Sequence, residues 1–240
     1  ELPRAGGRTT VWGGPVVWAA FDRYTAYGIS ATGEGGRASI SSCFYLLVKY
    51  LEMPPRVFVC PSDIGTSEFK LADEDSRPDF KLSDAWDFGP MPADNCSYTY
   101  HIPFGLYALS TAGDPNLAVA ADRNPWIMSP AADVDLSRWS SFVPDIRPWN
   151  GDRRAARLGN AISHEQDGQN VFFLDGHVAF ESRSYCSLEG DNIYTRSTNV
   201  AHGDAAGIMP RANALDHPAN RRDSFLLHDP PIFPPVQTHR

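Results

Sequence analysis

The sequence contains no apolar run that approaches the roughly 18 residues needed to span a membrane. Its first residues, "ELPRAGGRTTVWGGPVVWAAFDRY", also lack the apolar core of a signal peptide. Basic residues are scarce, since 21 Lys and Arg stand against 29 Asp and Glu and the net charge is −8. Sequence-independent binding to nucleic acid requires Lys and Arg to neutralise phosphates. We therefore expect no nucleic-acid partner.

Several catalytic motifs are missing as well. There is no CxxC pair for a zinc ribbon or thioredoxin-type site, and no GxSxG turn for a serine hydrolase. The glycine-rich stretch Gly33–Gly36 lacks the lysine of a phosphate-binding loop. Ser163 and His164 are adjacent, and neighbouring residues of a strand point to opposite faces, so they make a poor catalytic pair. We expect a protein without enzymatic activity.

Proline and glycine are abundant, at 20 and 19 of 240 residues, while 42% of the residues are hydrophobic. These values predict a globular chain with a real core and many long loops. We expect a single domain over residues 1–240, with an irregular N-terminal segment (1–38), a core (39–198) and an extended Pro-rich tail (199–240).

The clearest helix is predicted over residues 39–52, "SISSCFYLLVKYLE", where apolar residues recur at helical spacing after a serine-rich start. Pro54–Pro55 ends it, and a strand is predicted over 56–60, "RVFVC". Further strands are predicted within 96–104 and 117–127.

The strongest hairpin signal is Asp175–Gly176, a dipeptide typical of type I′ turns, between "NVFFL" and "HVAFES". We expect Val171, Phe173 and Val178 on the buried face of this hairpin. The fold class is predicted to be α+β, with one main helix packed on an antiparallel sheet.

Two kinds of metal site are conceivable around these elements. His164, Asp167, Asp175 and His177 carry ligands suited to zinc or another transition metal, although a hydrogen-bonded loop histidine is the commoner explanation. A metal-dependent hydrolase centred on His164, Asp175 and His177 would require bound zinc.

Calcium is the better candidate, because it prefers carboxylate and carbonyl oxygens on loops. Glu189, Asp191 and Asn192 lie on one predicted turn, and Asp175 is a further possible ligand. A second acidic stretch, "ADEDSRPD", holds Asp73, Glu74 and Asp75. Neither stretch has EF-hand spacing, and solvated acidic loops are the ordinary alternative.

The four cysteines, Cys43, Cys60, Cys96 and Cys186, lie far apart in the sequence. Buried free thiols and one or two disulfides are both compatible with their number.

Several segments resemble, in order, a large family of planctomycete and related bacterial prepilin-like proteins. They are "FVCPSD", "NCSYTYHIPF", "ADRNPWI", "GNAISHEQDGQNVFFLDGHVAFES", "YCSLEGDNIYT" and "RRDSFLLH". The family's C-terminal domain is named for a His, nine residues and an Asp-Gly, the prepilin-type processing-associated H-X9-DG domain. His164 and Asp175–Gly176 resemble this signature, with a spacer of ten residues instead of nine.

The resemblance implies a pilin-like globular head in a subunit of an extracellular or cell-surface filament, either a type IV pilus or a type II secretion pseudopilus. It also implies self-association, export, and membrane contact only through a hydrophobic N-terminal helix that is missing from this sequence. His164, Asp175 and Gly176 would be structural. Export would favour disulfides, with Cys60–Cys186 as the first pairing and Cys43–Cys96 as the second. A surface module that binds carbohydrate or another polymer through calcium-stabilised loops is the alternative function.

Overall fold

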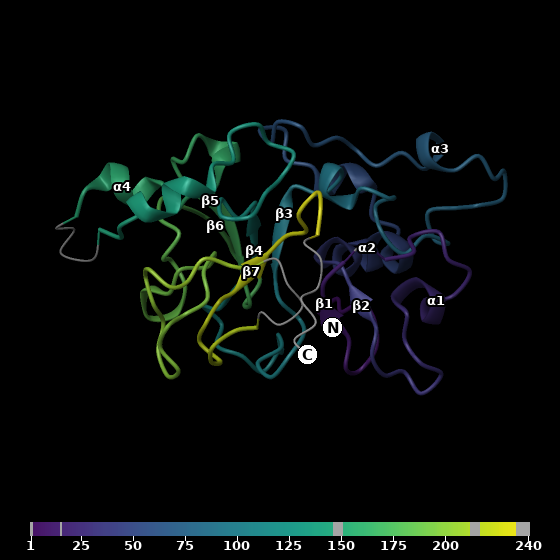
Figure 1. Cartoon of the computed structure of the whole chain (residues 1–240), viewed down its shortest axis with the longest axis horizontal. Coiled ribbons are helices and arrows are strands. Elements are labelled where there is room, and N and C mark those ends of the chain that lie inside the picture. The colour runs from purple at the N-terminus through teal and green to yellow at the C-terminus, as the bar shows by residue number, and fades with distance from the viewer. Residues whose placement is uncertain (1, 15, 146–150, 212–216, 234–240) are drawn as a thin grey trace.

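The structure is a computed structural model that describes residues 2–14, 16–145, 151–211 and 217–233. Its centre is a five-stranded antiparallel sheet in the order β6-β5-β4-β3-β7 (Figure 1). The strands are β3 (Tyr98–His101), β4 (Ala118–Asp122), β5 (Gln169–Phe173), β6 (Val178–Glu181) and β7 (Leu226–Leu227). A small parallel pair, β1 (Val11–Trp12) and β2 (Arg37–Ala38), lies apart from it. The predicted α+β class is confirmed in this coarse sense.

Helices are short except for one. They are α1 (Arg23–Tyr27), α2 (Ile40–Leu51), α3 (Leu71–Glu74) and α4 (Arg153–Arg157). Within the described ranges, five 3-10 helices accompany them: η1 (Pro55–Phe58), η2 (Pro92–Asp94), η3 (Leu136–Ser141), η4 (Ile162–His164) and η5 (Leu188–Gly190). No helix of the described residues is long and apolar enough to cross a membrane.

The main helix, α2, begins and ends where its sequence predicts. The Ser39 hydroxyl accepts a hydrogen bond from the Ser42 amide at 3.1 Å, and the Asp229 carboxylate accepts the Ile40 and Ser41 amides at 2.9 and 2.7 Å. These oxygens satisfy amides that have no partner within the helix. Glu52, with φ of 56°, ends the helix.

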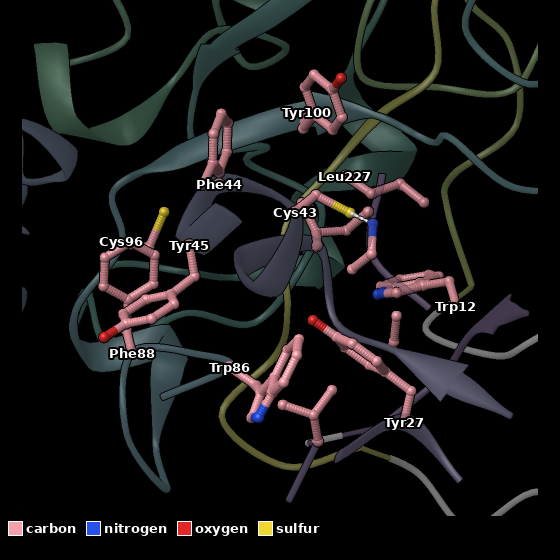
Figure 2. Close-up of a cluster of buried hydrophobic side chains, with 14 of the residues drawn as sticks. Trp12, Tyr27, Cys43, Phe44, Tyr45, Trp86, Phe88, Cys96, Tyr100 and Leu227 are labelled. Carbon is pink, nitrogen blue, oxygen red and sulfur yellow. Dashed lines mark hydrogen bonds between the residues drawn. The ribbon is translucent and has the colours of Figure 1, made fainter. Parts of the chain in front are cut away.

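The sheet separates two hydrophobic cores. On one face α2 and the N-terminal segments pack over the first core, in which Phe44 lies 5.3 Å from Tyr100 of β3, ring centre to ring centre (Figure 2). On the other face Val171 and Phe173 of β5 pack with Trp126 in the second core. Successive residues of a strand alternate between the two faces, which is why β5 contributes only every second side chain to the second core.

Two predictions about local structure are wrong. Residues 56–60 do not form a strand, because Pro55 begins η1 and Phe58 turns inward onto Phe44, 5.7 Å away between ring centres. The hairpin exists, but its turn is not type I′, since only Gly176 of the central pair has a positive φ, at 93°. The Gly176 amide bonds the Phe173 carbonyl, and the Phe173 amide bonds the His177 carbonyl, which is the pattern of a three-residue loop with a glycine bulge.

The predicted buried face of the hairpin is partly wrong. Val171 and Phe173 are buried, but Val178 pairs with Phe172 on the opposite face and is 65% exposed. The three-residue loop shifts the alternation of β6 relative to a two-residue turn, so Ala179 instead of Val178 faces the second core.

The predicted disulfides are not formed. All four cysteines are described, and all are free thiols: Cys43, Cys60, Cys96 and Cys186. Each sulfur has a different neighbour: Cys43 accepts from the Ala5 amide, whereas Cys60 lies beside His164. Cys186 packs against the second core, on the far side of the sheet from Cys43.

The division of the chain into an N-terminal segment, a core and a tail stays a prediction. The tail from residue 199 onward contributes β7, which pairs with β3 at the sheet edge. Residues 212–216 and 234–240 of that predicted tail lie outside the described residues.

Candidate functional site

Cys60, Asp122 and His164 meet in one cluster on the α2 side of the sheet. One ligand atom of each lies within 4.8 Å of the others. Among the described residues this is the one group of three or more His, Cys, Asp or Glu side chains close enough to share an ion. The three segments that carry the family resemblance, "FVCPSD", "ADRNP" and the His164 hairpin, each contribute one member.

The cluster is centred on a single ring nitrogen. His164 Nε2 lies 3.0 Å from Asp122 Oδ2, 3.9 Å from Cys60 Sγ and 3.2 Å from Asn170 Nδ2. Asp122 ends β4, and its Oδ2 also accepts the Asn170 backbone amide at 2.7 Å. The adjoining strands β4 and β5 therefore fix the carboxylate and the amide together.

His164 is held in place by an unusual loop. It ends η4 and is followed by Glu165 and Gln166, two successive non-glycine residues with φ of 54° and 60°. Such a conformation costs free energy and persists only when its surroundings enforce it. Asn160 enforces it here, since its side-chain amide donates to the Gln166 carbonyl at 3.0 Å.

Burial controls the charges in the cluster. It raises the pKa of the Cys60 thiol and of the Asp122 carboxyl, and for Asp122 the Asn170 amide and the His164 ring oppose the shift. Asp122 is 1% exposed, and its second oxygen, Oδ1, has no hydrogen-bond partner among the described residues. A buried unpaired carboxylate oxygen is costly.

The arrangement is not that of a cysteine nucleophile. A catalytic triad places the nucleophile and the acid on opposite nitrogens of the histidine. Here Cys60 and Asp122 both approach Nε2, and the raised pKa of the thiol keeps it protonated.

The signature Asp175–Gly176 lies at the tip of the hairpin, apart from this cluster. The Asp175 carboxylate contacts His177 Nδ1 at 2.5 Å, and the His177 ring stacks on Phe173 at 4.4 Å between centroids. These contacts stabilise the turn. His164, Asp175 and His177 therefore do not form the shared metal site that a hydrolase would need.

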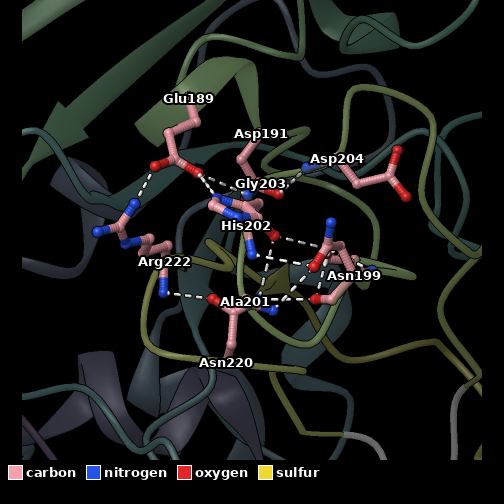
Figure 3. Close-up of polar contacts among 10 residues, drawn as sticks. Glu189, Asp191, Asn199, Ala201, His202, Gly203, Asp204, Asn220 and Arg222 are labelled. Atoms are coloured by element: carbon pink, nitrogen blue, oxygen red, sulfur yellow. Dashed lines mark hydrogen bonds and ion pairs between the residues drawn. The ribbon is translucent and has the colours of Figure 1, made fainter.

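The predicted calcium ligands serve the architecture of the C-terminal loops. Asp191 is buried, and its two oxygens accept the Asp204 and Ser224 amides at 2.9 and 2.7 Å. Figure 3 shows Glu189 between Arg222 and His202, with His202 Nδ1 3.0 Å from its carboxylate.

Asn192 belongs to the same group of loops. Its side-chain amide donates to the Ala205 carbonyl at 3.2 Å, and its oxygen accepts the Tyr194 amide at 3.1 Å. Calcium would have to displace contacts of this kind, and Asp175 belongs to a different loop. Calcium binding stays a prediction.

An apolar groove of about 460 Å³ adjoins the cluster. Phe44, Leu47 and Val57 line it from α2 and η1, and Phe172 and Val178 line it from β5 and β6. Phe172, Val178 and Phe180 lie on one face of the β5–β6 hairpin and are 37%, 65% and 55% exposed. This uncovered strip, Phe172, Val178 and Phe180, is named the hairpin face below.

A surface cavity of about 1140 Å³ lies on the other side of His164. Ser62, Asp63, Arg138 and Gln166 are among its lining residues. His164 is thus the member of the cluster that faces open space, while Asn170 separates the cluster from the apolar groove.

Comparison of the chain with protein-family models, curated proteins and solved structures finds no match to any of them. The case for a function rests on the geometry and on the sequence resemblance alone.

Sequence reasoning named His164 but not its partners. The only available signal was that Cys60 and Asp122 stand inside two of the family-like segments. It also missed Asp63 and Arg123, which form a buried ion pair at 2.6 Å beside the cluster.

Proposed function

We propose that the chain is a non-enzymatic structural subunit, the pilin-like head of an extracellular or cell-surface filament, which associates with further copies through the hairpin face and the adjoining apolar groove. The observation that carries the proposal is the hairpin face itself: three large apolar side chains side by side on two hydrogen-bonded strands, left open to solvent. Contiguous apolar surface beside a groove is typical of a contact site with another protein.

The position of the hairpin face supports self-association. β6 is an edge strand of the sheet, so the hairpin presents both an unpaired backbone edge and an apolar face. The opposite face of the same hairpin is fully used by Val171 and Phe173 in the second core. The second core therefore makes no use of the hairpin face.

Aromatic residues do not favour the carbohydrate-binding alternative. Trp12, Trp86 and Trp126 are buried, and Trp126 packs edge to face on Trp139 at 5.0 Å. Most aromatic side chains among the described residues are buried in the two cores.

Photo-crosslinking in the producing cells, with the complete gene, tests the proposal. A benzophenone amino acid at position 178 should give a ladder of crosslinked copies, whereas the same group at position 21 serves as the control. Phe21 is fully exposed but does not line the groove. Adding Phe172→Lys should abolish the ladder without changing the melting temperature, because Phe172 is partly exposed on the open face.

A ladder of equal strength from both positions, or none from position 178, would contradict the proposal. So would sedimentation of the secreted material as monomers at every concentration. Binding of a glycan on an array, lost on chelation of calcium, would support the alternative in its place.

A further inference from the structure

We propose that Cys60, Asp122 and His164 bind one divalent transition-metal ion of the zinc class, with a fourth coordination position directed toward the surface cavity of Ser62, Asp63, Arg138 and Gln166. The site is independent of the proposed assembly role. It follows from three donors that come from segments far apart in the chain, since Cys60 and His164 are 104 positions apart.

The spacing of the donors fits such an ion. Two donors at about 2.0–2.3 Å from a tetrahedral zinc ion lie about 3.3–3.7 Å from each other. His164 Nε2 and Asp122 Oδ2 are 3.0 Å apart, and His164 Nε2 and Cys60 Sγ are 3.9 Å apart. The two distances bracket the tetrahedral range, and the third donor pair, Asp122 and Cys60, lies within 4.8 Å, so side-chain shifts of up to about 1 Å would complete the site.

Hydrogen bonding leaves one buried atom of the cluster without a partner. Asp122 Oδ2 accepts both the backbone and the side-chain amide of Asn170 and lies beside His164 Nε2, so hydrogen bonds satisfy this oxygen. The buried Asp122 Oδ1 has no partner at all. A cation between the three side chains would accept the nitrogen lone pair and the sulfur, and would compensate the buried carboxylate.

The donor set selects the kind of ion. A thiolate together with an imidazole favours zinc, cobalt and similar metals over calcium and magnesium, which prefer oxygen ligands only. On binding, the Cys60 thiol loses its proton to solvent and sulfur donates its electron pair to the metal, so the affinity should rise with pH. No oxidant or reductant is involved.

Three protein ligands leave one position open, as in zinc sites that keep a bound water. His164 is the ligand that borders the surface cavity, so an ion would enter and exchange its water from that side. The ring of Phe180, 5.9 Å from the His164 ring, covers the imidazole edge to face and limits its rotation.

Cobalt absorption tests the proposal. The whole chain, stripped of metal with a chelator under reducing conditions, is titrated with Co²⁺ and then with Zn²⁺. We expect one equivalent of Co²⁺, a sulfur-to-cobalt charge-transfer band, and loss of that band when Zn²⁺ is added. Addition of Zn²⁺ should also raise the melting temperature of the apo-protein.

Variants assign the ligands. Cys60→Ser should abolish the charge-transfer band, and His164→Gln should weaken Co²⁺ binding by at least about tenfold. Matched controls are Cys186→Ser, another free cysteine, and His177→Gln, a histidine beside the same hairpin; both should bind Co²⁺ like the parent chain.

Several results would overturn the site. They are no charge-transfer band in the parent chain, a band that survives Cys60→Ser, or a band lost in Cys186→Ser. Circular dichroism of each apo-variant shows whether it is folded. His164 is partly exposed, so His164→Gln remains informative if Cys60→Ser does not fold.

Discussion

Replacing Asp87 with asparagine should change how the stability of the protein depends on pH. Asp87 is completely buried beside the start of α2, where its carboxylate accepts the hydroxyls of Ser39 and Ser41 and the Phe88 amide. Burial and the negative charge of nearby Asp229 together raise its pKa to about 7. Asparagine has nearly the same shape and cannot ionise; its oxygen can accept the Phe88 amide while its NH₂ donates to the serine hydroxyls.

The sign follows from the direction of the shift. A carboxyl whose pKa is higher in the folded state than in the unfolded state binds its proton more tightly when folded. Its contribution to stability is therefore complete below about pH 4 and is lost as the pH rises toward 7. With a pKa of about 7 folded and 3.8 unfolded, the loss between pH 5 and pH 8 is about 2 to 3 kcal/mol.

The slope of the wild-type chain would not isolate Asp87, because other buried groups, among them Asp223 with a pKa raised to about 6, also titrate in this range. Burial lowers the pKa of His101 to about 4, so keeping that ring neutral destabilises the fold as the pH falls below about 6.5. The effects of Asp87 and His101 oppose each other between pH 5 and pH 8. The useful quantity is therefore the difference in the free energy of unfolding between Asp87→Asn and wild type at each pH.

That difference should grow in favour of Asp87→Asn by about 2 to 3 kcal/mol from pH 5 to pH 8, or about 5 to 10 °C in melting temperature for a chain of this size. Urea denaturation followed by circular dichroism measures it directly. Asp79→Asn, which removes an exposed carboxyl from the same stretch of chain, is the control. If the difference were constant across this range, the buried carboxyl would not have the pKa described here and the reasoning would be refuted.

Three further substitutions test individual contacts. Arg123→Met should destabilise the fold by about 3–5 kcal/mol in urea denaturation, because it leaves the Asp63 carboxylate buried without its ion-pair partner, whereas Arg77→Met at an exposed ion pair should leave the midpoint unchanged. Asn124→Ala should cost at least about 2 kcal/mol by thermal unfolding, since its amide donates to two buried carbonyls. Gly176→Ala should cost about 1–2 kcal/mol, although no atom lies within 4 Å of the added carbon, because φ is 93°; unchanged hydrogen exchange in the hairpin would contradict this.

Local signals in the sequence predict the elements that depend on local chemistry. The helix α2 is fully anticipated by its serine cap, its apolar spacing and Pro54–Pro55, and the hairpin by Asp175–Gly176. The predicted turn type is wrong, because the backbone conformation of Asp175 depends on the hydrogen bond between Phe173 and His177 as much as on the Asp-Gly dipeptide. The strand predicted over residues 56–60 does not form, because Phe58 packs into the first core.

The candidate site could not be predicted in the same way. His164 attracts attention by its residue type, but Cys60 and Asp122 become its neighbours only when β4 and β5 pair and η1 packs beside them. Nothing in the local sequence encodes such a convergence. The calcium ligands show the reverse case, since Asp191 and Asn192 resemble ligands in sequence, yet in the structure their side chains bond backbone groups of neighbouring loops.

The Asp229 carboxylate, which receives the first amides of α2, also accepts the indole NH of Trp12 from 217 residues away at 2.9 Å. The N-terminus of α2 is therefore complete only when nearly the last described segment of the chain is in place. Contacts of such long sequence separation slow folding, because a large loop must close before they form. During synthesis the first core therefore stays unfinished until residues around 229 have left the ribosome, and nascent chains that stall earlier should be targets for chaperones and proteases.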